Sequence, residues 1–113
     1  MRPLVNGQLH ASSQANANQL AAFITAKTDT FPEFDTTEPV TVMAYHGGLW
    51  LVNFSILADT VVNADDLYDF VVGGWTSGGQ ANRILVGSTI KRTNNYDDEG
   101  NNQPDEIVRQ ATK

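Results

Sequence analysis

Two runs of strand-forming residues meet at a pair of glycines, and this arrangement constrains the fold more than any other feature of the sequence. The runs cover residues 40–46 and 49–57, and Gly47-Gly48 separates them. Glycine reaches positive φ without a Cβ clash, as the central positions of a tight hairpin turn require. The sequence therefore predicts an antiparallel hairpin over residues 40–57 with a two-residue turn. On its predicted core face the cross-strand pairs are large: Tyr45 with Trp50, Met43 with Val52, and Thr41 with Phe54.

The opposite face of the predicted hairpin is semi-polar but keeps enough apolar area to need cover. It carries Val40, Val42 and His46 on the first strand, with Leu49 and Leu51 on the second. Large exposed apolar patches are rare on soluble proteins and usually mark an interface. We therefore take these five residues as the candidate ligand or interface residues. A second copy of the chain is the simplest cover, because one patch then serves both partners.

Two helices and a further strand are predicted around the hairpin. Apolar residues recur at three- and four-residue spacing over 13–27, after a serine that can cap the first turn. A shorter helix is expected over 64–72, with Asn63 as its cap and Gly73-Gly74 at its end. Residues 83–91 have the β-branched content of a strand. We therefore expect an α+β fold, in which both helices pack on the aromatic face of a small antiparallel sheet.

At 113 residues the chain has the size of a single domain with one hydrophobic core. Residues 1–92 are expected to form that domain. Within them, residues 1–11 fit either a weak hairpin around Asn6-Gly7 or an extended segment on the domain edge. Residues 93–113 are acidic and rich in turn formers, with almost nothing to bury, which predicts a mobile tail. Pro104 is a suitable first residue for one short helix in that tail.

The tail contains a near match to the calcium-binding loop of helix-loop-helix proteins. That pattern places ligands at positions 1, 3, 5 and 12, and a glycine at the sharp bend of position 6. Asn95, Asp97, Glu99 and Glu106 fall on these four ligand positions, and Gly100 falls on the bend. Asparagine replaces the usual aspartate at position 1, and a proline lies inside the loop. We therefore expect calcium to change little.

Catalytic and cofactor chemistry find little support in the sequence. The chain has no cysteine, which excludes thiolate nucleophiles and thiolate metal sites. His46 is the candidate catalytic base, and Asp59 could orient it only if the second hairpin strand bent back. Two histidines and scattered carboxylates make no zinc-site spacing. We therefore expect no cofactor and rank an enzyme last.

The net charge of the chain limits the classes of partner that it can be expected to bind. Thirteen acidic residues against seven basic ones give a net charge of −6. Binding to nucleic acid or to an anionic membrane needs a surplus of basic residues, so we expect neither. The apolar runs are short and no targeting segment is visible, which favours a cytoplasmic location. The acidic clusters leave one alternative open, an inhibitor that mimics nucleic acid by presenting carboxylates at phosphate-like intervals.

Together, these features favour a small non-enzymatic binding or interaction protein that associates with itself or with another protein. A chain so short and poor in motifs would suit an accessory protein of a virus or mobile element. The nucleic-acid mimic and a module for calcium or a small ligand are the alternatives, followed by a small enzyme that uses His46. No residue pattern identifies the partner or the ligand.

Overall fold

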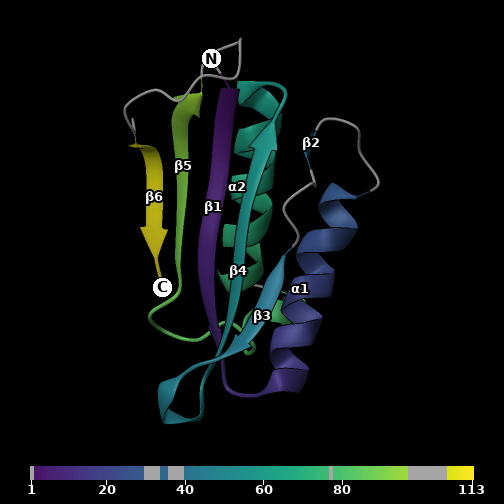
Figure 1. The fold of residues 1–113 in the computed structure, drawn as a ribbon, viewed down its shortest axis with the longest axis vertical. Coiled ribbons are helices and arrows are strands. Elements are labelled where there is room, and N and C mark those ends of the chain that lie inside the picture. Colours follow the sequence, from purple (N-terminus) through teal and green to yellow (C-terminus); the bar gives the residue numbers. More distant parts are fainter. Residues whose placement is uncertain (1, 30–33, 36–39, 77, 97–106) are drawn as a thin grey trace.

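The computed structural model describes residues 2–29, 34–35, 40–76, 78–96 and 107–113. These residues form a six-stranded antiparallel sheet and two long helices, which confirms the predicted α+β class (Figure 1). The strands are β1 (Arg2–Ala11), β2 (Phe34–Asp35), β3 (Thr41–Ala44), β4 (Trp50–Ala58), β5 (Thr89–Tyr96) and β6 (Ile107–Thr112). The helices are α1 (Gln14–Thr28) and α2 (Val61–Thr76), with short 3₁₀ turns at η1 (His46–Gly48) and η2 (Gly78–Gln80).

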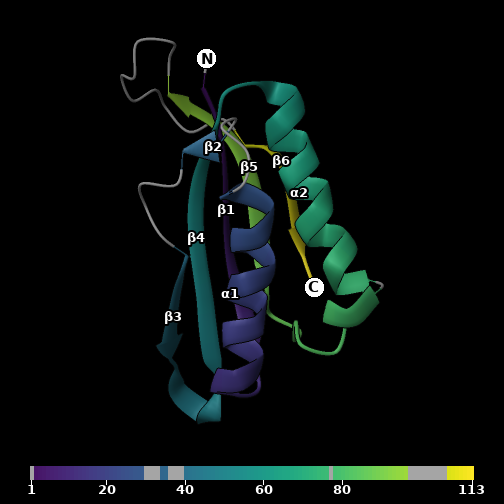
Figure 2. The ribbon, with the colours of Figure 1, turned by 90° about the vertical axis from the view of Figure 1, so that its right-hand side faces the viewer.

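The strand order is β2-β4-β1-β5-β6, and β3 pairs with β4 on the same edge as β2. If β2 and β3 are counted as one strand position and β6 is set aside, the chain runs β-α-β-β-α-β. That order, with β1 between β4 and β5, is the split βαβ or ferredoxin-like topology. Both helices lie on one side of the sheet, as predicted, and neither covers the other side (Figure 2). In the described part of the chain, no helix is long and apolar enough to cross a membrane.

The hydrophobic core lies between the sheet and the two helices. Ser13 caps α1, as expected, because its Oγ accepts a hydrogen bond from the backbone N–H of Asn16 at 3.1 Å. The predicted apolar stripe of α1 is buried at Ala17, Leu20 and Ile24. The rings of Phe23 on α1 and Phe70 on α2 are stacked with their centroids 4.3 Å apart. This stack joins the two helices above the core.

Helix α2 is longer than the expected helix over 64–72. Its cap is Thr60 rather than Asn63, because Thr60 Oγ1 accepts a hydrogen bond from the Asn63 backbone N–H at 3.1 Å. The helix also continues through Gly73 and Gly74 to Thr76. A Cβ at Gly74 would lie 2.9 Å from the ring of Phe23. Gly74 therefore allows a close approach of the two helices and does not end α2.

The largest difference from expectation is β1, which is the central strand of the sheet and neither a hairpin nor an edge segment (Figure 1). Val5 and Leu9 of β1 are fully buried in the core. Asn6-Gly7 is not a turn, because the ring of Phe54 on β4 packs over the backbone at Gly7. A Cβ there would lie 2.5 Å from Phe54 Cζ. The glycine is therefore required by packing against an aromatic ring.

The predicted hairpin forms from β3 and β4, but three residues, His46 to Gly48, separate its last paired positions. The backbone N–H of Tyr45 donates to the carbonyl of Leu49 at 2.9 Å. Gly47 and Gly48 both have positive φ, at 72° and 78°. The expected glycine conformations are thus present, but the third loop residue shifts the register by one.

A one-residue shift moves every side chain of a strand to the other face of the sheet. On β4 the expected core residues are right, since Val52 and Phe54 are buried and Trp50 is half-buried. On β3 the two faces are exchanged. Val42 lies opposite Val52 and packs against the core, whereas Tyr45, expected in the core, is 42% exposed.

The remaining strands also differ from expectation. The strand predicted over 83–91 begins only at residue 89, as β5, and residues 84–88 form a loop before it. Residues 107–112 form β6 on the free edge of β5, where a short helix was expected. Ala111 lies opposite Ile90 and packs against the core. In the tail that was expected to be mobile, residues 93–96 belong to β5 and 107–112 form β6, whereas 97–106 lie outside the described residues.

Candidate functional site

The side of the sheet that the helices leave uncovered, here called the open face, is the candidate functional surface. Alternation along each strand and the pairing between strands assign its residues. They are Leu4, Asn6, Gln8 and His10 of β1, Asp35 of β2, Thr41 and Met43 of β3, Leu51, Asn53, Ser55 and Leu57 of β4, Thr89, Lys91 and Thr93 of β5, and Ile107, Gln110 and Thr112 of β6.

The open face is almost free of charge. Among its described side chains only Lys91 and Asp35 are ionic. The other charged side chains that the structure describes belong to the helices, to loops or to the helix side of the strands. Among the described side chains, the polarity of this surface therefore comes mostly from amides and hydroxyls.

Hydrogen-bonded amides occupy the middle of the open face. Gln8 Nε2 donates to Asn53 Oδ1 across the β1–β4 pair at 3.2 Å. Asn53 Nδ2 in turn lies 3.4 Å from the sulfur of Met43, which is 51% exposed. The contacts fix the Asn53 amide between two neighbouring strands. The Gln8 side chain is exposed, so part of its hydrogen-bonding capacity still faces outward.

Three rings gather where the open face meets the hairpin tip. The ring centroids of Tyr45 and His46 are 4.0 Å apart, and those of His10 and Tyr45 are 5.9 Å apart. The loop after α2 closes over His10, because a Cβ at Gly87 would lie 3.2 Å from His10 Nδ1. The backbone N–H of His10 donates to Ser88 Oγ at 2.9 Å and holds that loop in place.

One buried hydroxyl on the open face has no hydrogen-bond partner. Thr93 is 4% exposed, and its Oγ1 is the one such side-chain atom among the described residues. Leu4, which lies opposite Thr93, is buried as well. This end of the open face is therefore covered, whereas exposed side chains such as Gln8 and Lys91 lie nearer the middle.

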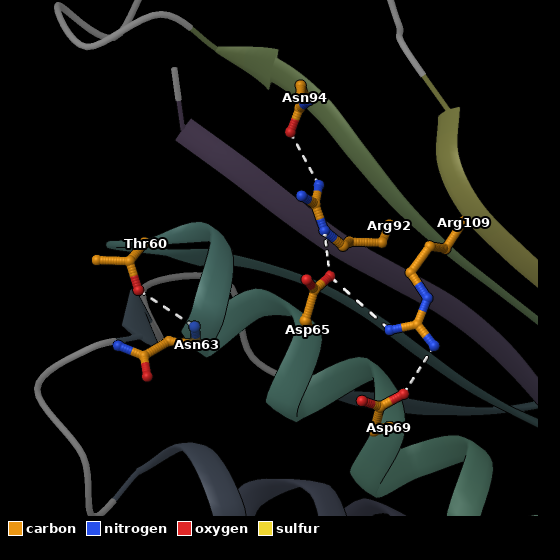
Figure 3. Close-up of polar contacts among 7 residues, drawn as sticks. All are labelled: Thr60, Asn63, Asp65, Asp69, Arg92, Asn94 and Arg109. Atoms are coloured by element: carbon orange, nitrogen blue, oxygen red, sulfur yellow. Dashed lines mark hydrogen bonds and ion pairs between the residues drawn. The ribbon is translucent and has the colours of Figure 1, made fainter.

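The ionic groups of the opposite side form a network between α2 and the last two strands (Figure 3). Arg92 Nε donates to Asp65 Oδ1 at 2.6 Å, and Arg92 Nη1 donates to Asn94 Oδ1 at 2.8 Å. Arg109 Nη2 of β6 donates to Asp69 Oδ1 at 2.8 Å. The hydrogen bond to Asp69 raises the pKa of Arg109 above its usual value. The network attaches β5 and β6 to α2, and we assign it a structural role.

The five interface residues predicted from the sequence do not gather on one surface. Val40 and Val42 pack against the core, because the register shift places them on the helix side. Leu49 is half-buried beside the hairpin loop, and His46 is exposed at its tip. Leu51 is on the open face, but it is only 4% exposed between its register neighbours on β1 and β3.

The candidate calcium ligands are only partly described. The backbone of Asn95 belongs to β5, whereas Asp97, Glu99 and Glu106 lie outside the described residues. Elsewhere, in the described segments, no group of three or more histidine, aspartate or glutamate residues could hold a metal ion. The structure therefore does not test the near match to a calcium loop.

The candidate catalytic pair is not assembled. His46 precedes β4 and Asp59 follows it, so the nine residues of that strand separate them. At about 3.4 Å per residue the strand spans roughly 30 Å. Asp59 Oδ1 instead accepts a hydrogen bond from Asn63 Nδ2 at 2.7 Å. The carboxylate therefore cannot orient His46.

The central residues of the open face were missed because β1 was not recognised as a strand. Its sequence did carry a signal, since Leu9 and Val5 alternate with the polar residues Asn6, Gln8 and His10. Alternation of this kind is typical of a strand with one face in the core. Asn6-Gly7 obscured it by resembling a turn.

No protein-family model matches the sequence, and a search among curated proteins found no similar chain. The open face must therefore be judged by its own chemistry. It has a broad surface, few charges, several exposed amides and hydroxyls, and a ring cluster at one end.

Proposed function

We propose that the chain is a non-enzymatic interaction protein that associates with a second copy of itself through the open face of its sheet. The observation that supports this most is that only two of the described side chains on that face are charged. The central parts of protein interfaces are depleted in charged residues relative to the rest of the surface. The open face has this composition.

Among the described residues, electrostatics favour this surface over the helix side. Two copies that each carry a charge of −6 repel one another in most orientations. A contact through the helix side would bring the exposed carboxylate of Asp66 close to that of the partner. A contact through the open face avoids this carboxylate, so among the described charges it brings fewer like charges together.

Amides and hydroxyls suit a symmetric contact. In a two-fold interface the same patch must pair with itself. A carboxamide such as that of Gln8 both donates and accepts hydrogen bonds, and so does a hydroxyl such as that of Ser55. These groups can pair with their own copies, which a patch of carboxylates cannot do.

The first and last described segments of the chain, which could otherwise fold back over this face, are both part of the sheet. Residues 2–11 form its central strand and residues 107–112 form its edge. Neither lies across the open face (Figure 2). Two open faces packed together at the usual spacing of about 10 Å would form a sandwich with the helices on the outside.

The nucleic-acid mimic draws less support from the described residues. Asp65 and Asp69 of α2 are held by Arg92 and Arg109, which offset their charge. A mimic needs carboxylates that are free to face a basic groove. Two of the acidic residues in the predicted cluster over 65–69 are therefore poorly suited to that role.

A matched pair of substitutions tests the proposal. Gln8→Glu places a charge at the centre of the open face, and Gln19→Glu places the same charge on the exposed side of α1. In sedimentation velocity we expect Gln8→Glu to raise the dissociation constant of the dimer at least about tenfold, because like charges then meet across the interface. Gln19→Glu should leave it unchanged. Equal behaviour of the two variants, with both folded by circular dichroism, would show that the interface lies elsewhere.

A further inference from the structure

A hydrogen bond to the sulfur of Met43 ends the row of side chains that crosses the open face. Asn53 of β4 contacts Met43 of β3 through its Nδ2 atom, which lies 3.4 Å from the sulfur. On the other side, Gln8 of β1 donates to Asn53 Oδ1 at 3.2 Å. Because the Gln8 donor takes the amide oxygen, the amide nitrogen is left to face the sulfur. Side chains from three neighbouring strands thus hold the Asn53 amide in one orientation (Figure 1).

The Met43 side chain is accessible as well as hydrogen-bonded. Met43 is 51% exposed, on a strand that pairs only with β4 among the described strands. The chain has no cysteine, which is the other sulfur-containing side chain that peroxides oxidise. Its second methionine, Met1, lies outside the described residues. Among the described side chains, Met43 is therefore the preferred target of a two-electron oxidant.

We propose that Met43 is a site of reversible oxidation by peroxides, and that Asn53 directs the oxygen to one side of the sulfur. A lone pair of the thioether sulfur attacks one peroxide oxygen, the O–O bond breaks and a sulfur–oxygen bond forms. The sulfur loses two electrons and the peroxide is reduced, so hydrogen peroxide gives methionine sulfoxide and one molecule of water. A sulfoxide reductase restores the thioether with two thiols, which become a disulfide as the oxygen leaves in water.

The contact with Asn53 determines which lone pair reacts. A thioether sulfur carries two lone pairs, and addition of oxygen to one or the other gives the two sulfoxide epimers. The Asn53 amide donates to one lone pair, so the peroxide reaches the other more easily. Attack at the occupied lone pair requires the amide to move, which also breaks its hydrogen bond with Gln8. The net value of one hydrogen bond corresponds to a preference of about threefold or more.

Oxidation changes the chemistry of the open face. Methionine is flexible and apolar, whereas its sulfoxide is polar and chiral. The sulfoxide oxygen accepts hydrogen bonds well, whereas the thioether sulfur accepts them only weakly. An oxygen on the side away from Asn53 leaves the contacts of that amide in place. The reaction therefore adds a polar acceptor to the open face while β3 stays paired with β4.

Repair by the two epimer-specific sulfoxide reductases tests the proposal. The folded chain is treated with hydrogen peroxide at a concentration where light scattering gives the mass of one chain, so the outcome does not depend on self-association. Mass spectrometry follows the gain of one oxygen in the peptide that contains Met43. Each reductase then acts on a separate portion of the digested peptide, with dithiothreitol as the thiol. We expect one reductase to repair at least about three times as much sulfoxide as the other. Wild-type chain oxidised in urea should give nearly equal amounts.

Two variants separate the effect of Asn53 from that of exposure alone. Asn53→Leu removes the donor but keeps the size of the side chain, so the two epimers should become nearly equal. Ser55→Ala, two residues further along the same face of β4, keeps the contact and should keep the wild-type preference. Circular dichroism checks that both variants are folded.

Three results would count against the proposal. Equal amounts of the two epimers in the folded wild type, or an unchanged preference in Asn53→Leu, would overturn the directing effect of Asn53. Oxidation of Met43 that is more than about tenfold slower in the folded chain than in urea would overturn the site itself, because susceptibility to oxidation follows exposure.

Discussion

Arg92 of β5 and Asp65 of α2 form an ion pair of 2.6 Å in which the two partners differ greatly in exposure. Only 2% of the arginine side chain is exposed, compared with 37% of the aspartate side chain. The aspartate therefore compensates a buried charge while keeping contact with water itself. Arg109 Nη1 lies 3.8 Å from the same carboxylate oxygen. The pair connects the sheet to α2, and its asymmetry leads to unequal mutational costs.

Asp65→Ala should destabilise the fold more than Arg92→Met does. Loss of the aspartate leaves the buried guanidinium without its counter-ion, which costs about 3–5 kcal/mol of unfolding free energy. Loss of the arginine leaves a carboxylate that water and Arg109 still stabilise. Urea unfolding measures both, with the exposed neighbour Asp66→Ala as a control that should stay within about 0.5 kcal/mol. Equal costs at Asp65 and Arg92 would contradict this account of the pair.

Two glycine substitutions should have opposite effects. Gly7→Ala inserts a methyl group 2.5 Å from Phe54 Cζ and 3.2 Å from the Thr89 carbonyl, so we expect a loss of about 1–3 kcal/mol in unfolding free energy. Gly73→Ala meets no atom within 4 Å and lies inside α2, so it should raise that energy by about 0.5–1 kcal/mol. Thermal and urea unfolding of both variants give the comparison. A destabilising Gly73→Ala would show that α2 ends before residue 73.

Stability should fall at alkaline pH through Tyr68. Burial raises the pKa of its phenol above the usual value of 10.0, partly offset by the nearby Arg109. The folded chain therefore holds this proton more tightly than the unfolded chain does. The resulting stabilisation is complete below pH 10 and is lost as the pH rises through the folded-state pKa. Urea unfolding between pH 8 and about 11 should show a steeper decline for the wild type than for Tyr68→Phe. Parallel curves would argue against this role.

Hairpin residues on the same strand should differ in their contribution. Phe54 is 4% exposed and fills the core beside Gly7, so Phe54→Ala should cost about 3–5 kcal/mol of unfolding free energy. Trp50 is half-buried at the end of β4, so Trp50→Ala should cost less. Urea unfolding of the two variants is the measurement. A larger loss of unfolding free energy for Trp50→Ala would indicate that the hairpin end contributes more to core packing than its burial suggests.

Local patterns predicted the α+β class, the apolar stripe of α1 and the core face of β4. Each of these depends on periodicity within one segment, which the sequence displays directly. The register of the hairpin depended on the length of its loop. Both glycines have the expected positive φ, but His46 is a third loop residue. It shifts the pairing of β3 with β4 by one position, so the opposite face of β3 points toward the core.

The remaining features depend on contacts between distant segments. In the sequence, Gly7 resembles a turn residue. Its role becomes visible only in the structure, where the ring of Phe54, 47 positions later in the chain, packs over it. Residues 107–112 have little to bury alone, but they find backbone partners on the free edge of β5. The open face was misassigned for the same reason, because its central strand is recognisable only once the sheet is assembled.

The molar mass of the wild-type chain in solution tests the central claim most directly. Multi-angle light scattering should be performed at a series of protein concentrations from the low micromolar range upward. We expect the mass to rise from that of one chain, 12.3 kDa, to a plateau at twice that value. A plateau at two chains is the result that a closed two-fold contact requires. A mass of 12.3 kDa that stays constant over the whole series would contradict self-association through the open face.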